Sequence, residues 1–113
     1  MVNGTLYIQG VIALDPDSGK LVGANIEGQT KRVFDSIKAI LEGGGMRMAN
    51  VVKVTVYLSD LEDYHKFNKV YESYFSKDAP PVRTTVEAKP PFGALVEADA
   101  IACRADEKQD NRV

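Results

Sequence analysis

The chain has 113 residues, a formal net charge of −2 at pH 7 and a single cysteine. This length fits one domain, and the charge supplies no overall positive field that would attract nucleic acid or anionic lipid. No apolar run approaches the roughly 20 residues that cross a bilayer, and one cysteine excludes an intrachain disulfide, so we expect a cytoplasmic protein with no membrane partner.

Residues 6–14 predict the first strand, because they are rich in β-branched and aromatic side chains. Gly10 inside this run indicates a bulge, or a place where another group approaches the backbone closely. The following residues 15–19 contain proline and glycine and are typical of a turn. We therefore expect residues 20–22 to return as a short second strand.

An amphipathic helix is expected next. Asn25 can cap its start, and the glycine run 43–45 ends it. Apolar residues recur at the spacing of one helix face. They are Val33, Phe34, Ile37, Ile40 and Leu41.

Residues 50–59 alternate in the manner of a strand. The expected inner face carries Val52, Val54, Val56 and Leu58, and the other carries Lys53, Thr55 and Tyr57. The second face mixes apolar and polar side chains, as a sheet face packed against another subunit would.

A second helix is predicted after residues 60–63, whose acidic side chains suit a helix start. Its buried stripe comprises Phe67, Val70, Tyr71, Tyr74 and Phe75. The only histidine, His65, has no second histidine or cysteine near it in sequence, so we expect no metal site there. Pro80 and Pro81 stop the helix.

Two further strands are expected over residues 82–88 and 94–103, joined by a turn at 89–93 and running antiparallel to each other. Val82, Thr84, Val86 and Ala88 share one face of the first, and Arg83, Thr85 and Glu87 share the other. We expect one domain over residues 1–103 and a polar C-terminal tail over residues 104–113.

This order of elements predicts an α+β domain with two layers and a mostly antiparallel, mixed sheet. Both helices are expected on one face of the sheet. The open face then carries Arg83, Glu97, Tyr57, Thr55 and Lys53. An open face of that composition indicates that chains associate.

Arg83 is the most informative residue, because a charge inside a strand costs free energy unless a partner pairs with it. Its natural partner is a carboxylate bound bidentately. That carboxylate belongs either to a ligand or, in a salt bridge between subunits, to Glu97, Asp99 or Glu87. Glu97 and Asp99 lack a third metal ligand, and no nucleophile–base pair stands out. Arg83 with Glu97 instead suits a small carboxylate-bearing substrate and one activated water.

Four segments resemble the Rid/YjgF family, the enamine and imine deaminases once described as translation inhibitors or endoribonucleases. They are residues 52–61, 67–75, 80–87 and 96–102, and the resemblance extends from Asn3 to Cys103. It implies a chorismate-mutase-like fold assembled as a homotrimer, with clefts between subunits. It also implies hydrolysis of 2-iminopropanoate or 2-iminobutanoate to a 2-keto acid and ammonia, without a cofactor.

The resemblance also implies roles for particular residues. Arg83 matches the arginine that grips the substrate carboxylate, and Glu97 matches the glutamate that positions the attacking water. Asn68 matches an asparagine of the second helix. Gly10 matches the strand glycine whose backbone lines the pocket, and Thr85 takes the place of a residue that is often cysteine.

The first strand departs from the family pattern. Gln9 stands where a serine usually precedes the strand glycine, and Val11 stands where a glutamine follows it. The family's tyrosine before this strand has no counterpart. We therefore expect the wall of the cleft that the first strand forms, which includes Gln9, to differ from the wall in other family members. Two alternatives to a deaminase stay open: a regulatory trimer that binds small carboxylates without turnover, and an endoribonuclease. The acidic charge balance and the lack of a basic-aromatic patch argue against nucleic acid as a partner.

Overall fold

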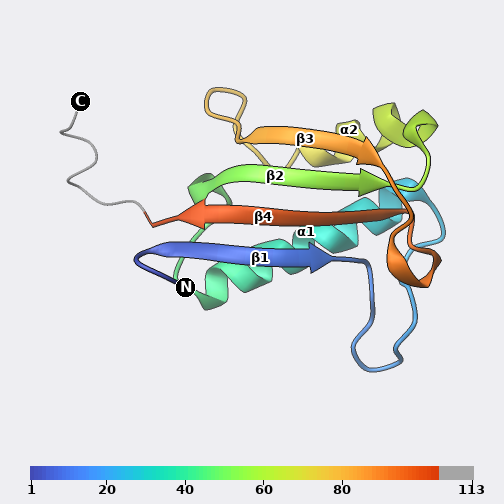
Figure 1. Cartoon of the computed structure of the whole chain (residues 1–113), viewed down its shortest axis with the longest axis horizontal. Coiled ribbons are helices and arrows are strands. Elements are labelled where there is room, and N and C mark those ends of the chain that lie inside the picture. Colours follow the sequence, from blue (N-terminus) through green and yellow to red (C-terminus); the bar gives the residue numbers. More distant parts are fainter. Residues whose placement is uncertain (105–113) are drawn as a thin grey trace.

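The computed structural model describes residues 1–104, so the tail expected at 104–113 lies outside the described residues from residue 105 on. Four strands form a sheet, and two helices pack on one of its faces (Figure 1). The elements are β1 (Thr5–Val11), α1 (Ile26–Gly43), β2 (Val51–Leu58), α2 (Tyr64–Glu72), β3 (Val82–Glu87) and β4 (Val96–Cys103), with 3-10 turns at Met48–Asn50, Leu61–Asp63 and Pro91–Gly93. The expected two-layer α+β fold is confirmed.

The order of strands across the sheet is β1-β4-β2-β3 (Figure 1). The last strand, β4, lies between β1 and β2 and is antiparallel to both, whereas β2 and β3 are parallel. A parallel pair needs a crossover connection, which α2 supplies. The expected direction of β4 relative to β3 is therefore correct, but β4 pairs with β1 and β2 and not with β3.

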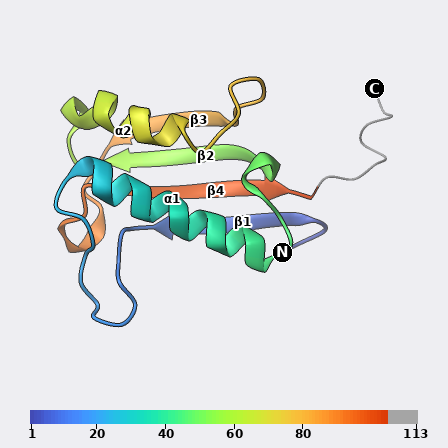
Figure 2. The ribbon, with the colours of Figure 1, turned by 180° about the vertical axis from the view of Figure 1, so that it is seen from behind.

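The core lies between the sheet and the helices, which Figure 2 shows in front of the strands. Asn25 caps α1 as predicted, since its side chain accepts a hydrogen bond of 2.8 Å from the Gly28 backbone N–H. Phe34, Ile37 and Leu41 are buried, but Ile40 is 44% exposed. The prediction that Ile40 belongs to the buried face is wrong, because this side chain lies at the edge of the apolar stripe.

Two departures from regular strand structure explain further differences. The register of β2 shifts between Val51 and Lys53, so Val51 is buried while Val52, expected inside, is 45% exposed. A bulge of this kind inserts one residue and reverses the faces beyond it. Residues 20–22 do not form the expected strand; Leu21 makes a single bridge to Leu14.

Side chains on the face of the sheet away from the helices come from all four strands. They include Tyr7, Thr55, Tyr57, Val82, Val86, Glu97 and Ile101, as the pairing register shows. Tyr7 is 64% exposed and Val82 is 66% exposed. We call this surface the open face. Among residues 1–104, no helix combines the length and the apolar character needed to cross a membrane.

Candidate functional site

Arg83 lies on the helix side of the sheet and not on the open face where we expected it. It pairs in register with Val54 of β2, which is fully buried under the helices, and paired residues of neighbouring strands point to the same side. The alternation along β3 is confirmed, but alternation does not say which set of residues faces the helices. Since β3 is an edge strand, Arg83 stays only half-buried there.

Side chains of α2 hold the guanidinium of Arg83 in place. Nη1 donates a hydrogen bond of 2.5 Å to Asn68 Oδ1, and Nη2 donates one of 2.5 Å to the Tyr64 hydroxyl. The guanidinium carbon lies 4.7 Å from the ring centroid of Tyr71, within cation–π range. Because a guanidinium has five N–H donors, this arrangement orients Arg83 and leaves donors for a carboxylate.

No acidic side chain among residues 1–104 forms an ion pair with Arg83; the ion pair found there joins Lys31 and Asp35. Glu87, on the same strand, instead accepts a hydrogen bond of 3.0 Å from the Leu61 backbone N–H. A half-buried cation without an acidic partner favours binding of an anion from outside the chain.

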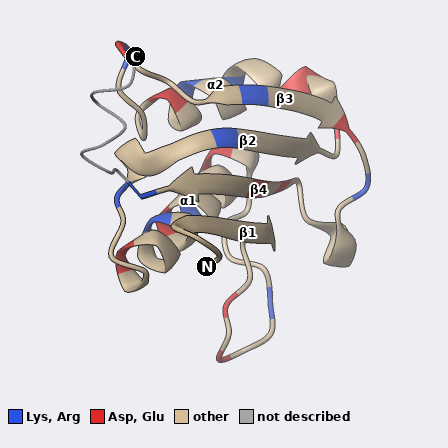
Figure 3. Cartoon of the chain, turned by 60° about the vertical axis from the view of Figure 1, so that its left-hand side comes forward, with Lys and Arg blue, Asp and Glu red and all other residues tan. Residues whose placement is uncertain are grey.

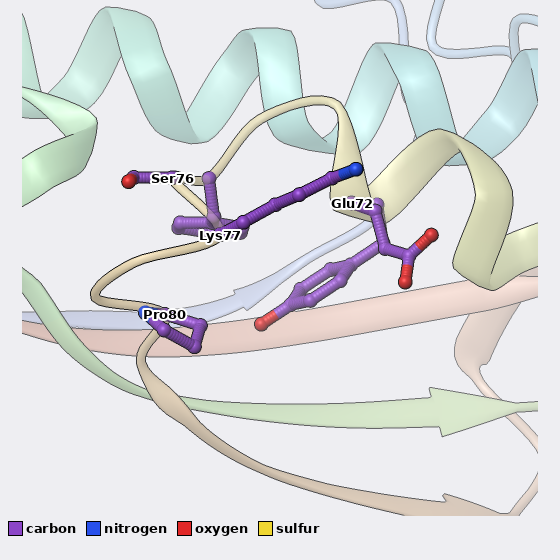
Figure 4. A pocket seen from close by; sticks show the side chains of 6 residues that line it. Glu72, Ser76, Lys77 and Pro80 are labelled. Carbon is purple, nitrogen blue, oxygen red and sulfur yellow. The ribbon is translucent and has the colours of Figure 1, made fainter.

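A surface hollow of about 290 Å³ opens beside Arg83. Its lining comprises Asn68, Tyr71, Glu72, Pro80, Pro81 and Arg83. A second hollow of about 240 Å³ shares Tyr71, Glu72 and Pro80 with it, and Figure 4 shows Glu72, Ser76, Lys77 and Pro80 around this second space. An anion at Arg83 therefore has room for a small organic group next to it.

Glu97 and Gly10 meet on the open face. The register of β1 shifts between Ile8 and Val11, which confirms the bulge expected at Gly10. A Cβ on residue 10 would clash with Glu97 Oε2 and lie 2.8 Å from Cδ, so only glycine leaves room for the carboxylate in this position. The absence of a side chain at residue 10 thus permits the position of Glu97.

Asp99 shares the open face with Glu97 but is engaged elsewhere. It accepts a hydrogen bond of 3.2 Å from the Tyr57 hydroxyl. The negative charge of Asp99 raises the pKa of Tyr57, and burial and Glu97 act in the same direction. The Tyr57 hydroxyl is therefore protonated at neutral pH and donates its hydrogen bond to Asp99. Within residues 1–104 Glu97 has no such hydroxyl partner, which leaves it available to bind water.

The remaining predicted site residues lie either near Arg83 or near Glu97. Thr85 is on the Arg83 side of β3, and its buried hydroxyl has no hydrogen-bond partner among residues 1–104. Gln9 lies at the bulge of β1 and lines a shallow hollow with Asp99. One chain therefore groups Arg83 with Asn68 and Thr85, and groups Glu97 with Gly10 and Gln9, on opposite faces of the sheet.

Tyr64 belongs to the Arg83 group, but we did not predict it. The signal was its spacing on α2: residues 64, 68 and 71 follow the helical repeat and face the same strand. The sequence does not reveal that β3 lies next to this face of α2, and without that contact Tyr64 reads as an ordinary helix residue.

The chain is similar in sequence to known proteins. The family model described as "Endoribonuclease L-PSP" matches residues 1–104. A RutC family protein of Pyrococcus abyssi is 46% identical over 102 residues, which cover 89% of this chain and 80% of that protein. The human 2-iminobutanoate/2-iminopropanoate deaminase is 35% identical over 102 residues, covering 90% of this chain and 74% of that protein.

Solved structures agree with the fold. The crystal structure of E. coli TdcF with bound serine superposes with a TM-score of 0.85 at 28% sequence identity. The match covers 93% of this chain and 84% of that one. The sheet and both helices of this chain are thus shared with relatives over nearly the whole described length.

Proposed function

The chain belongs to the Rid/YjgF family, the one described as endoribonuclease L-PSP, and we propose that it hydrolyses reactive 2-imino acids to 2-keto acids and ammonia. The observation that carries this proposal is Arg83, a guanidinium oriented by Asn68 and Tyr64 beside a surface hollow. The human relative is named for this activity, which supports the choice of substrate.

The proposed substrate has a carboxylate next to an electrophilic C=N carbon. Arg83 binds the carboxylate and so converts an encounter in solution into an oriented one. A water hydrogen-bonded to Glu97 adds through its oxygen to the C=N carbon and loses a proton to Glu97, which passes it to the imine nitrogen to give a carbinolamine. The carbinol hydroxyl then gives its proton to the amino nitrogen, the C–N bond breaks with its electron pair leaving on ammonia, and the carbonyl group of the 2-keto acid forms.

We propose that the complete site forms between subunits of a homotrimer. Arg83 and Glu97 point to opposite sides of the sheet in one chain, so one ligand cannot contact both within it. Exposed Tyr7, Val82 and Val86 on the open face support self-association. A neighbouring copy then supplies the Glu97 group to the Arg83 group.

The test generates 2-iminobutanoate in situ with a threonine dehydratase and follows release of the keto acid. We expect the wild-type chain to accelerate release, and Arg83→Ala to reduce the acceleration about 100-fold, because a charge-assisted bidentate contact is lost. Arg47→Ala, which removes an exposed arginine at the start of a 3-10 turn, is the matched control. Equal release with and without wild-type protein would refute the proposal.

A trimer that binds small carboxylates without turnover is the second candidate, favoured by the serine bound to E. coli TdcF. It predicts saturable binding of 2-oxobutanoate, weakened by Arg83→Ala, with no acceleration of imine hydrolysis. Calorimetric titration beside the in-situ assay separates the two candidates.

An endoribonuclease is the third candidate, supported by the description of the family model. Lys and Arg are interspersed with Asp and Glu along the described chain (Figure 3), whereas phosphate binding needs clustered basic residues. This candidate requires RNA cleavage that persists through repurification and is lost in Arg83→Ala.

A further inference from the structure

Tyr71 keeps a buried hydroxyl that has no hydrogen-bond partner among residues 1–104. The residue is 5% exposed. Two nearby tyrosines differ from it: the hydroxyl of Tyr64, at the start of α2, accepts from Arg83, and the hydroxyl of Tyr74, just after the end of α2, donates to Asp35 Oδ1 at 2.7 Å. A buried polar group left unpaired costs free energy, so each such group in a native protein calls for an explanation.

The position of Tyr71 suggests that explanation. Its ring centroid lies 4.7 Å from the Arg83 guanidinium carbon, and it lines both the hollow beside Arg83 and the second hollow that shares residues with it. Burial raises the pKa of Tyr71, so its hydroxyl carries a proton at neutral pH and can donate it in a hydrogen bond. A neutral donor and a guanidinium at one hollow together match an anionic oxygen acceptor.

We propose that Tyr71 is a second substrate-binding residue, whose hydroxyl donates to the carboxylate that Arg83 binds, and that the hollow beyond it receives the substrate side chain. This inference rests on the proposed function, since it takes the same carboxylate as ligand.

The lining of that hollow indicates the class of side chain. Tyr71, Phe75 and Pro80 supply apolar surface, and the polar groups of Glu72, Ser76 and Lys77 lie around them (Figure 4). A space of about 240 Å³ accommodates a branched aliphatic chain, which is larger than the methyl or ethyl group of the smallest 2-imino acids. The predicted substrates are therefore imines of amino acids with apolar side chains of several carbons.

The first experiment measures binding without turnover. Wild type, Tyr71→Phe and the matched control Tyr74→Phe are titrated with 2-oxobutanoate and 4-methyl-2-oxopentanoate. We expect Tyr71→Phe to weaken the binding of both acids about tenfold, because one hydrogen bond to a charged group is lost. The Tm of the unliganded protein should not fall. Tyr74→Phe should lower that Tm and leave both Kd values unchanged. Wild-type affinities in Tyr71→Phe, or no binding by the wild type, would overturn the inference.

The second experiment tests the hollow. Ser76→Phe should fill the hollow and weaken the binding of 4-methyl-2-oxopentanoate at least fivefold, while the affinity for 2-oxopropanoate stays the same. Ser73→Phe, which changes an exposed serine outside this lining, is the control. Equal effects of Ser76→Phe on both acids would overturn the assignment of the hollow.

The two proposals fail in different ways. A chain that binds these acids through Tyr71 but does not accelerate imine hydrolysis refutes the deaminase and keeps this inference. A chain that hydrolyses 2-iminobutanoate with an unchanged KM and kcat after Tyr71→Phe refutes this inference and keeps the deaminase.

Discussion

Arg83 and Glu97 are held by different means. Arg83 is oriented by side chains, namely two hydrogen bonds to α2 and the ring of Tyr71. Glu97 depends on the missing side chain of Gly10, which leaves the space that the carboxylate occupies. Orientation matters at this site because displacing a reacting group by about 1 Å can cost on the order of 100-fold in rate.

Gly10→Ala should therefore lower the activity while leaving the stability of the fold nearly unchanged. The new Cβ meets the flexible end of Glu97, which can move aside, so we expect a change of less than about 1 kcal/mol in the free energy of unfolding. Imine hydrolysis should fall about 100-fold, because Glu97 no longer holds its water in place. Gly43→Ala, where a Cβ meets nothing within 4 Å, is the control. Urea denaturation and the in-situ assay measure the two effects, and full activity in Gly10→Ala would contradict the role of Glu97.

The elements show how the site is assembled from parts distant in sequence. The crossover through α2 places that helix over β3, and this contact brings Asn68 and Tyr64 to Arg83. In contrast, no residue of α1 hydrogen-bonds to Arg83 within the described chain, and α1 covers β1 and β4. Damage to α1 should consequently reduce stability more than it reduces ligand affinity.

Asn25→Ala tests whether α1 contributes to stability and not to ligand affinity. It removes the N-cap hydrogen bond to Gly28, and loss of such a cap costs about 1 kcal/mol. We expect the Tm to fall by roughly 4–8 °C, while the Kd for 2-oxobutanoate at 25 °C stays unchanged. Asn25→Ser keeps a capping oxygen and should retain most of the stability. An unchanged Tm in Asn25→Ala would show that the cap contributes nothing.

At the scale of the molecule, the two residue groups lie on opposite faces of one sheet, and the open face exposes apolar side chains. Both features make the proposed function depend on assembly. Disrupting the open face should then abolish hydrolysis even though Arg83 and Glu97 remain in each chain.

Val86→Glu makes that dependence measurable. Val86 is 39% exposed on the open face, and a carboxylate there would be desolvated on assembly. We expect light scattering to show three times the 12.4 kDa chain mass for the wild type and a single chain mass for the variant, with loss of imine hydrolysis. Val22→Glu, at a residue that is 37% exposed in a loop, should assemble and react normally. An active monomer would contradict a shared site.

The sequence by itself determined the local structure and the candidate chemistry. The N-cap at Asn25, the bulge at Gly10 and the alternation along residues 82–87 all follow from short-range backbone geometry and side-chain periodicity. Only the tertiary structure decided the face on which Arg83 lies, the neighbour of β4 and the place of Tyr64 next to the guanidinium. The physical reason is that an alternating pattern is symmetric between the two faces of a sheet, and long-range packing alone removes that symmetry.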